Sequence, residues 1–247
     1  MRVLIVGMGN VGTRLCAELA PLGPECYDKT DPFGPEGRYD FAFICVDTPL
    51  VHTENGYVLD DVAIHQAMDE VVADIYVIKS TVMPMTTEMI TFSTRNHIVL
   101  SPEYYGTTQH GPKDTGFTVL GGDREDCIKV QQLLQGVYDA SHRFVITDHR
   151  TAELAKLMEN CWIATKVSFC DQFYDLAERY GVSYEELREI FVMDPRVSPS
   201  HTYVYRDRPY WSSHCLDKDV PATASMGAPL IDAVIAFNDA RKQQCNI

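Results

Sequence analysis

The sequence predicts an α/β protein in which a doubly wound, mostly parallel sheet is followed by an all-helical domain with one long helix. Three observations support this prediction. A β-branched run at residues 2–6 leads directly into a glycine-rich turn and a helix. Short apolar runs then alternate with helical stretches up to residue 147, which is the pattern of parallel βαβ units. From residue 148 the strands stop, so we expect two domains, at residues 1–147 and 148–247.

The predicted strands are short runs rich in β-branched and aromatic residues. Residues 40–46 form an almost continuous apolar run, as expected for a strand of a parallel sheet that is buried on both faces. We expect strands at residues 2–6, 25–28, 40–46, 75–79, 98–100, 117–122 and 144–146.

The predicted helices begin and end at recognisable capping residues. Asp60 can cap a helix that continues to about residue 73, and Ser183 with Glu186 forms a capping box for another. Gly181 is suited to end the long helix. We expect helices at residues 13–20, 60–73, 86–94, 123–136, 148–180, 184–191 and 230–242. Residues 192–218 lack a clear period, and a long irregular stretch of this kind is usually functional.

The run at residues 7–12, GMGNVG, follows the first strand directly and fits the pattern GxGxxG. The first glycine makes the tight turn, the second lets the backbone approach a pyrophosphate, and the third allows close helix packing. The pattern in this setting predicts a Rossmann-like dinucleotide site, although a glycine turn in an unrelated α/β protein is the alternative. The expected cofactor contacts are Gly7, Gly9, Asn10, Val11 and Gly12.

Asp28 ends the second predicted strand, about 20 residues after the glycine-rich loop. A carboxylate there would accept hydrogen bonds from the ribose hydroxyls and would repel a 2′-phosphate, which favours NAD over NADP. A solvated turn acid is the alternative. Lys29 follows directly and is a second expected cofactor contact. Thr48, Thr81 and Glu103 follow later strands, at the carboxyl ends where such sheets bind ligands.

Composition narrows the classes of partner. The formal net charge of −14 argues against nucleic-acid binding, because the phosphate backbone would be repelled. No apolar run approaches the ~20 residues of a membrane span, and the opening lacks a signal-peptide layout, so we expect a cytoplasmic protein without a membrane anchor. Eight cysteines are scattered without a CxxC pair. We therefore expect no metal site and reduced, mostly buried thiols.

Taken together, these motifs resemble those of the UDP-glucose/GDP-mannose 6-dehydrogenases, which oxidise nucleotide sugars to uronates. The resemblance extends from the glycine-rich loop almost to the last residue. It is carried by residues 7–12, 43–49, 79–82, 101–104, 152–157 with Asn160, 215–219, and 228–234 leading into Asn238 and Arg241.

The resemblance implies a catalytic cysteine. Cys215 would attack the aldehyde formed by a first oxidation, and the thiohemiacetal would be oxidised to a thioester and then hydrolysed. Lys156 and Asn160, four residues apart on one helix, would stabilise the thiolate and the oxyanion. The resemblance also gives Asp219 and Glu103 proton transfer, Thr81 the positioning of water, and Lys218 a contact with cofactor phosphates. From the residues alone, Lys156 and Asn160 could be helix-surface side chains, Glu103 a strand-end cap and Cys215 a buried inert thiol.

Several features depart from the family. The family has a further nucleotide-binding domain after the central helices, which we expect this chain to lack. Its glycine-rich run before the cysteine is replaced by residues 210–214, YWSSH, and its basic extension after the Pro-Glu motif by residues 105–110. Met85 stands where the family usually has glycine. These changes alter the substrate half and leave the NAD half intact.

The sequence therefore predicts NAD-dependent oxidation of a nucleotide-sugar-like anionic alcohol by a homodimer paired through the long helix, as the resemblance implies. Two alternatives stay open. One is a two-electron dehydrogenase of the β-hydroxyacid type, which shares the two-domain layout and a helix lysine comparable to Lys156. The other is a catalytically silent NAD-binding member of the family.

Overall fold

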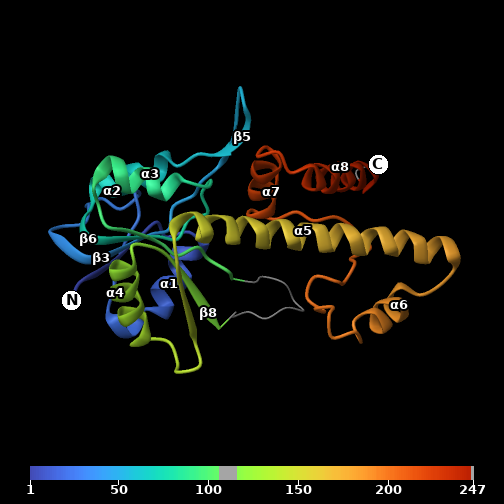
Figure 1. The fold of residues 1–247 in the computed structure, drawn as a ribbon, viewed down its shortest axis with the longest axis horizontal. Coiled ribbons are helices and arrows are strands. Elements are labelled where there is room, and N and C mark those ends of the chain that lie inside the picture. Colours follow the sequence, from blue (N-terminus) through green and yellow to red (C-terminus); the bar gives the residue numbers. More distant parts are fainter. Residues whose placement is uncertain (106–115, 246–247) are drawn as a thin grey trace. The chain divides into compact units, whose positions relative to one another are not determined.

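A computed structural model describes residues 1–105 and 116–245 and confirms the predicted α/β architecture (Figure 1). A seven-stranded sheet has the order β2-β1-β3-β6-β7-β8-β9. All neighbouring strands pair in parallel except β7 and β8, which are antiparallel. The strands are β1 (Val3–Val6), β2 (Glu25–Tyr27), β3 (Arg38–Ile44), β6 (Val72–Ile78), β7 (Ile98–Leu100), β8 (Phe117–Gly122) and β9 (Arg143–Thr147).

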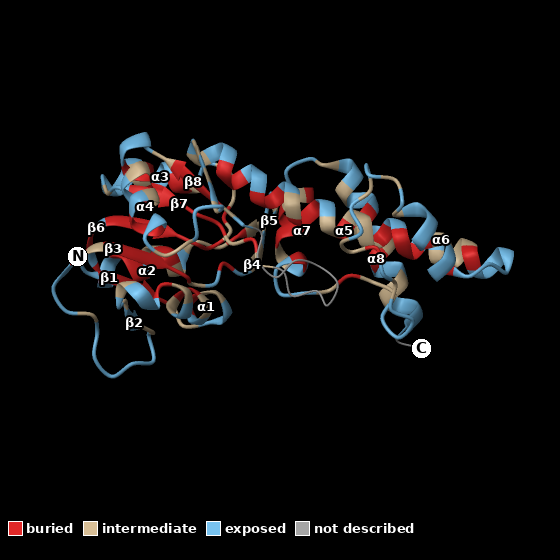
Figure 2. Ribbon diagram, turned by 90° about the horizontal axis from the view of Figure 1, so that it is seen from below, coloured by how far each residue is buried: buried red, intermediate tan, exposed pale blue. Residues whose placement is uncertain are grey.

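Helices cover both faces of this sheet. One buried cluster joins the sheet to α2 (Val62–Glu70) and α3 (Thr86–Thr94), and a second joins its other face to α1 (Asn10–Glu18) and α4 (Arg124–Gln135). Whereas β2 at the edge of the sheet is largely exposed, the central strands are buried on both sides, as Figure 2 shows for β1, β3 and β6. Such burial explains why their sequences are nearly continuous apolar runs.

The helical part of the chain begins with α5 (His149–Tyr180), which ends at Gly181 as predicted, with a φ of 67° at the glycine. Three further helices follow: α6 (Tyr184–Phe191), α7 (Leu216–Ala224) and α8 (Pro229–Cys245). The Ser183 side chain accepts a hydrogen bond from the Glu186 amide, which confirms the predicted cap of α6. Trp211 packs with residues of α5, α7 and α8 in a buried cluster.

The chain divides into two compact units. The first contains residues 1–51, 58–104 and 116–156, and the second contains residues 52–57, 105 and 157–245 of the described chain. Helix α5 therefore begins in the first unit and ends in the second. The expected domain boundary after residue 147 stays a prediction.

The structure corrects three expectations about local structure. Helix α2 ends at Glu70 and β6 already begins at Val72, so the predicted helix to residue 73 was too long. Residues 50–59 form a two-stranded sheet, β4 (Leu50–Thr53) and β5 (Gly56–Leu59), that the prediction lacked. Helix α7 was also absent from the prediction, although it begins directly after Cys215.

Candidate active site

The glycine-rich loop connects β1 to α1 and leaves room where a cofactor phosphate would approach. A Cβ atom on Gly7 would lie 2.8 Å from the Cys45 carbonyl oxygen, and one on Gly12 would lie 1.9 Å from the Gly7 oxygen. Gly9, at the N-cap of α1, has no such neighbour within 4 Å. Gly7 and Gly12 are therefore required by packing, whereas Gly9 faces open space at a helix N-terminus that favours anions.

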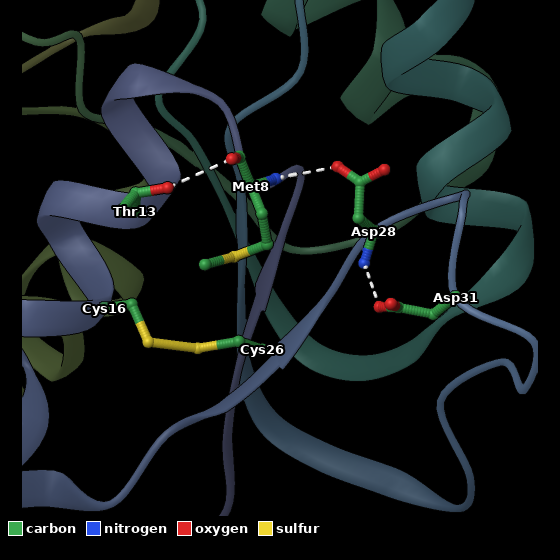
Figure 3. The surroundings of a disulfide bond; sticks show 6 residues. All are labelled: Met8, Thr13, Cys16, Cys26, Asp28 and Asp31. Atoms are coloured by element: carbon green, nitrogen blue, oxygen red, sulfur yellow. Dashed lines mark hydrogen bonds between the residues drawn. A yellow bond between two sulfur atoms is a disulfide. The ribbon is translucent and has the colours of Figure 1, made fainter.

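Asp28 holds this loop in place (Figure 3). Its Oδ2 accepts a hydrogen bond of 2.9 Å from the Met8 amide, and its Oδ1 accepts bonds from the amide and hydroxyl of Thr30. These bonds lower the pKa of Asp28, and the bond from the Met8 amide is the largest cause of the shift. An ionised acid at the end of β2, next to the loop, fits a ribose contact. Lys29 follows it as an exposed side chain.

The loops after β3 and β6 are joined by two side chain–backbone hydrogen bonds. The buried hydroxyl of Thr48 donates a hydrogen bond of 2.6 Å to the Thr81 carbonyl, and Ser80 donates one of the same length to the Val46 carbonyl. The structure thus brings two of the predicted residues, Thr48 and Thr81, together at the carboxyl edge of the sheet.

Glu103 is paired with Lys79, a residue to which sequence analysis gave no role. The Lys79 Nζ lies 3.1 Å from Glu103 Oε2 and donates to the Ser101 hydroxyl, while Glu103 Oε1 accepts a bond from the Tyr104 amide. The Lys79 side chain is 8% exposed and that of Glu103 is 16% exposed. The signal for this pair was available in the sequence, because each residue follows an apolar strand closely and the strands are neighbours in the sheet.

Lys156 is buried rather than solvated. Its Nζ lies 4.8 Å from the centre of the Tyr104 ring, close enough for a cation–π interaction. The surface alternative for Lys156 is therefore wrong. Since Tyr104 directly follows Glu103, the first unit places a lysine ammonium beside the segment that carries a predicted proton-transfer group.

The second unit holds a buried polar cluster. The Asn160 amide nitrogen donates a bond of 2.6 Å to Asp219 Oδ2, and the Lys218 Nζ donates one of 2.8 Å to Asp219 Oδ1. Asp219 is fully buried and Asn160 is 4% exposed, so the surface alternative for Asn160 is also wrong. The oxyanion contact of Asn160 and the phosphate contact of Lys218 stay predictions.

Cys215 lies immediately before α7 and is exposed. Its backbone carbonyl accepts bonds from the amides of Lys218 and Asp219, which begins the helix. A helix N-terminus stabilises negative charge, as a thiolate or an oxyanion would carry. Cys215 is therefore not the buried thiol of the alternative, and its reactivity stays a prediction.

The loop before Cys215 carries a tryptophan that points into the core. The Trp211 indole nitrogen donates to the Ser168 hydroxyl at 3.1 Å, and Asn238 bonds to both backbone groups of Trp211. Trp211 is 4% exposed, so its bulk is removed from the surface of the loop. Of the other replaced segment, residues 106–110 lie outside the described residues.

The cysteines differ from the expectation of reduced, buried thiols. Cys16 and Cys26 form a disulfide, which overturns the prediction for this pair. Burial raises the pKa of the Cys45 and Cys127 thiols to about 12. Among residues 1–105 and 116–245, no group of three or more His, Cys, Asp or Glu side chains could hold a metal ion. No helix in this same part of the chain is long and apolar enough to cross a membrane.

The sequence of the chain is similar to those of known nucleotide-sugar dehydrogenases. Residues 150–240 match the UDP-glucose/GDP-mannose dehydrogenase family, central domain. The chain is 24% identical over 222 residues to UDP-N-acetyl-D-mannosamine dehydrogenase of Methanocaldococcus jannaschii, covering 82% of this chain and 49% of that protein. It is 27% identical over 223 residues to UDP-glucose 6-dehydrogenase of Rickettsia conorii, with coverages of 82% and 49%. The chain thus spans about half the length of these curated relatives.

Solved structures share the fold. A UDP-glucose dehydrogenase from Pyrobaculum islandicum superposes with a TM-score of 0.78 at 21% identity, covering 97% of this chain and 68% of that chain. A 3-hydroxyisobutyrate dehydrogenase from Mycobacterium tuberculosis gives a TM-score of 0.71 at 14% identity, covering 100% of this chain and 94% of that one. At these identities the likeness shows the fold alone.

Proposed function

Because the chain belongs to the UDP-glucose/GDP-mannose dehydrogenase family, we propose that it oxidises the primary alcohol of a nucleotide sugar to the carboxylate, with NAD as the oxidant. The observation that carries this proposal is the cluster around Asp219. Burying a carboxylate, an ammonium and an amide together costs stability unless each is paired. Asn160 of α5 forms such a cluster with Lys218 and Asp219 in the first turn of α7, which begins directly after an exposed cysteine.

The cofactor half of the proposal is supported by the first unit. The open space at Gly9, the N-terminus of α1 and the anchored carboxylate of Asp28 fit a dinucleotide. When bound, NAD accepts a hydride in each of two oxidations. The residues proposed to hold it are Gly7, Gly9, Asn10, Val11, Gly12, Asp28, Lys29, Thr48, Thr81 and Lys218.

The proposed chemistry at Cys215 has three parts. The first oxidation turns the alcohol into an aldehyde, and the Cys215 thiolate adds to its carbonyl carbon to give a thiohemiacetal. Lys156 and Asn160 stabilise the oxyanion formed in this addition. The second oxidation gives a thioester, and water displaces the thiolate to release the carboxylate. Asp219 and Glu103 accept the protons released in these steps, and Thr81 orients the water.

We also propose that the enzyme is a homodimer paired through α5. The helix carries exposed apolar side chains at a spacing that places them along one stripe, and such a stripe is normally covered in a soluble protein. Met158 is 76% exposed and Trp162 is 59% exposed. The stripe consists of Leu154, Met158, Trp162, Phe169 and Phe173.

A direct assay tests the proposal. Purified protein is mixed with NAD and, separately, with UDP-glucose, UDP-N-acetyl-D-mannosamine and GDP-mannose, and NADH is followed by absorbance together with the sugar product. We expect two NADH per carboxylate formed with at least one of these substrates. One NADH per product would favour a two-electron dehydrogenase instead. NAD binding without turnover on any substrate would favour a catalytically silent protein.

A further inference from the structure

We propose that Cys16 and Cys26 form a thiol–disulfide exchange site whose oxidation state sets how tightly the protein binds NAD. This inference goes beyond the oxidation of a sugar and rests only on the cofactor half of the proposed function. Its substrate is a dithiol reductant, which reacts with the disulfide in the first unit.

The disulfide links the two elements that form the expected cofactor site. Cys16 lies in α1, whose N-terminus faces the phosphate position, and Cys26 lies in β2, two residues before Asp28 (Figure 3). The two Cα atoms are 6.9 Å apart, and the cysteines are separated by ten residues in the sequence. The bond therefore closes a short loop that joins the phosphate-facing helix to the strand that positions the ribose acid.

Without this bond, strand β2 is held by its pairing with β1 and by a few side-chain contacts, among them the Tyr27 hydroxyl bond to Glu70 and the packing of Tyr27 on the buried cluster. It is three residues long, lies at the edge of the sheet and pairs only with β1 in the described sheet. Its Glu25 makes an ion pair with Arg2, but both side chains are about half exposed, and surface pairs of this kind contribute little. The Glu25 carboxylate also accepts a bond from Tyr39. Apart from the peptide chain itself, the disulfide is the one covalent link between β2 and another element in the described structure.

A shift of β2 would also displace the glycine-rich loop, because the two are joined by hydrogen bonds. Asp28 accepts the hydrogen bond from the Met8 amide, and the Gly7 amide donates to the carbonyl of Tyr27 at 2.8 Å. Met8 and Cys16 pack against the same buried cluster, and the Met8 side chain extends toward the disulfide in Figure 3. Reduction of the disulfide would thus increase the mobility of both Asp28 and the glycine-rich loop. NAD would then have to order them on binding, which weakens its affinity.

The disulfide is accessible to a reductant. Cys26 is exposed and Cys16 is partly buried, so a thiolate of the dithiol can attack the Cys26 sulfur. The bond between the two protein sulfurs breaks, and Cys16 leaves as a thiolate that takes up a proton. The second thiol of the reductant then displaces Cys26 as a thiol. Two electrons and two protons pass from the dithiol to the protein, and the reductant becomes a disulfide.

Titration of NAD by calorimetry tests the inference. The protein is compared after oxidation, after reduction with excess dithiothreitol, and after reoxidation, with the bond state checked by mass spectrometry. We expect reduction to raise the Kd for NAD about ten-fold and reoxidation to restore it. Cys16→Ser and Cys26→Ser should each bind like the reduced protein and ignore dithiothreitol. Cys245→Ser, which removes an exposed cysteine in α8, should keep the full response.

A second measurement does not depend on the cofactor. Hydrogen exchange of peptides covering residues 7–13 and 25–31 should become faster on reduction, while peptides from β3 stay unchanged. Equal Kd values in both states, or an equal response in Cys16→Ser, would overturn the inference. Absence of NAD binding in both states would count against the proposed cofactor, and exchange rates unchanged by reduction would then overturn the exchange site as well.

Discussion

The Asn160 amide and the Asp219 carboxylate form a hydrogen bond of 2.6 Å between α5 and α7, and both side chains are buried. The Lys218 ammonium occupies the other carboxylate oxygen at 2.8 Å. Asp219 is thus held from two sides, four residues after Cys215. Burying a carboxylate here costs desolvation free energy, and hydrogen bonds from its neighbours are needed to offset that cost.

Removing the Asn160 amide should leave Asp219 with an unsatisfied oxygen. We expect Asn160→Ala to lower the free energy of unfolding by roughly 2 kcal/mol, because a buried acceptor loses its donor. Urea unfolding followed by circular dichroism measures this. Asn55→Ala, at an exposed turn, is the matched control and should change stability by less than about 0.5 kcal/mol. Equal effects of the two substitutions would show that the Asn160 bond contributes nothing to stability.

Lys79 and Glu103 should be strongly coupled. We expect Lys79→Met and Glu103→Gln each to cost roughly 3 kcal/mol, with partial recovery in the double variant, because either single change leaves a buried partner unpaired. A double-mutant cycle by urea unfolding gives the coupling energy. The pair Arg150 and Glu88, about half exposed, is the control and should couple by at most about 1 kcal/mol. A buried pair coupled no more strongly than this surface pair would refute the prediction.

Met85 has a left-handed backbone conformation, with a φ of 77°, which favours glycine. Its amide donates to the buried carboxylate of Glu153, which also accepts bonds from Thr87, so the conformation is imposed by the cap of α3. We expect Met85→Gly to stabilise the protein by about 0.5–1 kcal/mol, since a side chain in this region costs energy. Thermal unfolding checks this. Met89→Gly, inside α3, should instead destabilise by about 1 kcal/mol, and a loss of stability in both variants would contradict the argument.

Asp171 should make stability depend on pH. Burial raises the pKa of this carboxyl to about 7, opposed by Arg241 and reinforced by Asp175. The native state therefore binds the proton more tightly than the unfolded state, whose pKa is about 3.9. The stabilisation from this tighter proton binding is fully present below about pH 4 and is lost as the pH rises through about 7. The free energy of unfolding should fall by up to roughly 4 kcal/mol over this range.

Urea unfolding near pH 5 and near pH 8 tests this sign. We expect Asp171→Asn to gain stability relative to the wild type on going to the higher pH. Asp232→Asn, at an exposed position of α8, should show the same difference from the wild type at both values. A constant difference for Asp171→Asn would mean that this carboxyl titrates normally in the folded protein.

The sequence predicted the sheet, the glycine-rich loop and the long helix because each leaves a local signal. Gly181 ends α5 since its left-handed φ is available to glycine, and Gly7 and Gly12 are imposed by close contacts. The sheet of β4 and β5 also had a signal that was overlooked, the Asn55–Gly56 turn between two apolar runs. Helix α7 was hidden by Pro221 and by the absence of a standard capping residue at Cys215.

Pairings between distant residues could not be obtained in this way. The disulfide depends on α1 and β2 meeting at a particular register, and eight cysteines allow many pairings. The bond from Asn160 to Asp219 joins residues 59 apart on different helices. The resemblance implied a site role for both residues and gave no sign that they contact each other. The pairing of Lys79 with Glu103 could have been predicted from the sequence, since the strands that they follow are adjacent and parallel.

The central claim is that Cys215 carries the acyl group during the reaction. Wild-type protein is mixed with NAD and a nucleotide sugar that yields NADH, quenched in acid during turnover, and digested for mass spectrometry. We predict that the peptide containing Cys215 gains the mass of the oxidised nucleotide sugar, and that Cys215→Ser gains none and stops before carboxylate formation while still binding NAD. Formation of carboxylate by Cys215→Ser, or turnover of the wild type with no mass added at Cys215, would contradict the account.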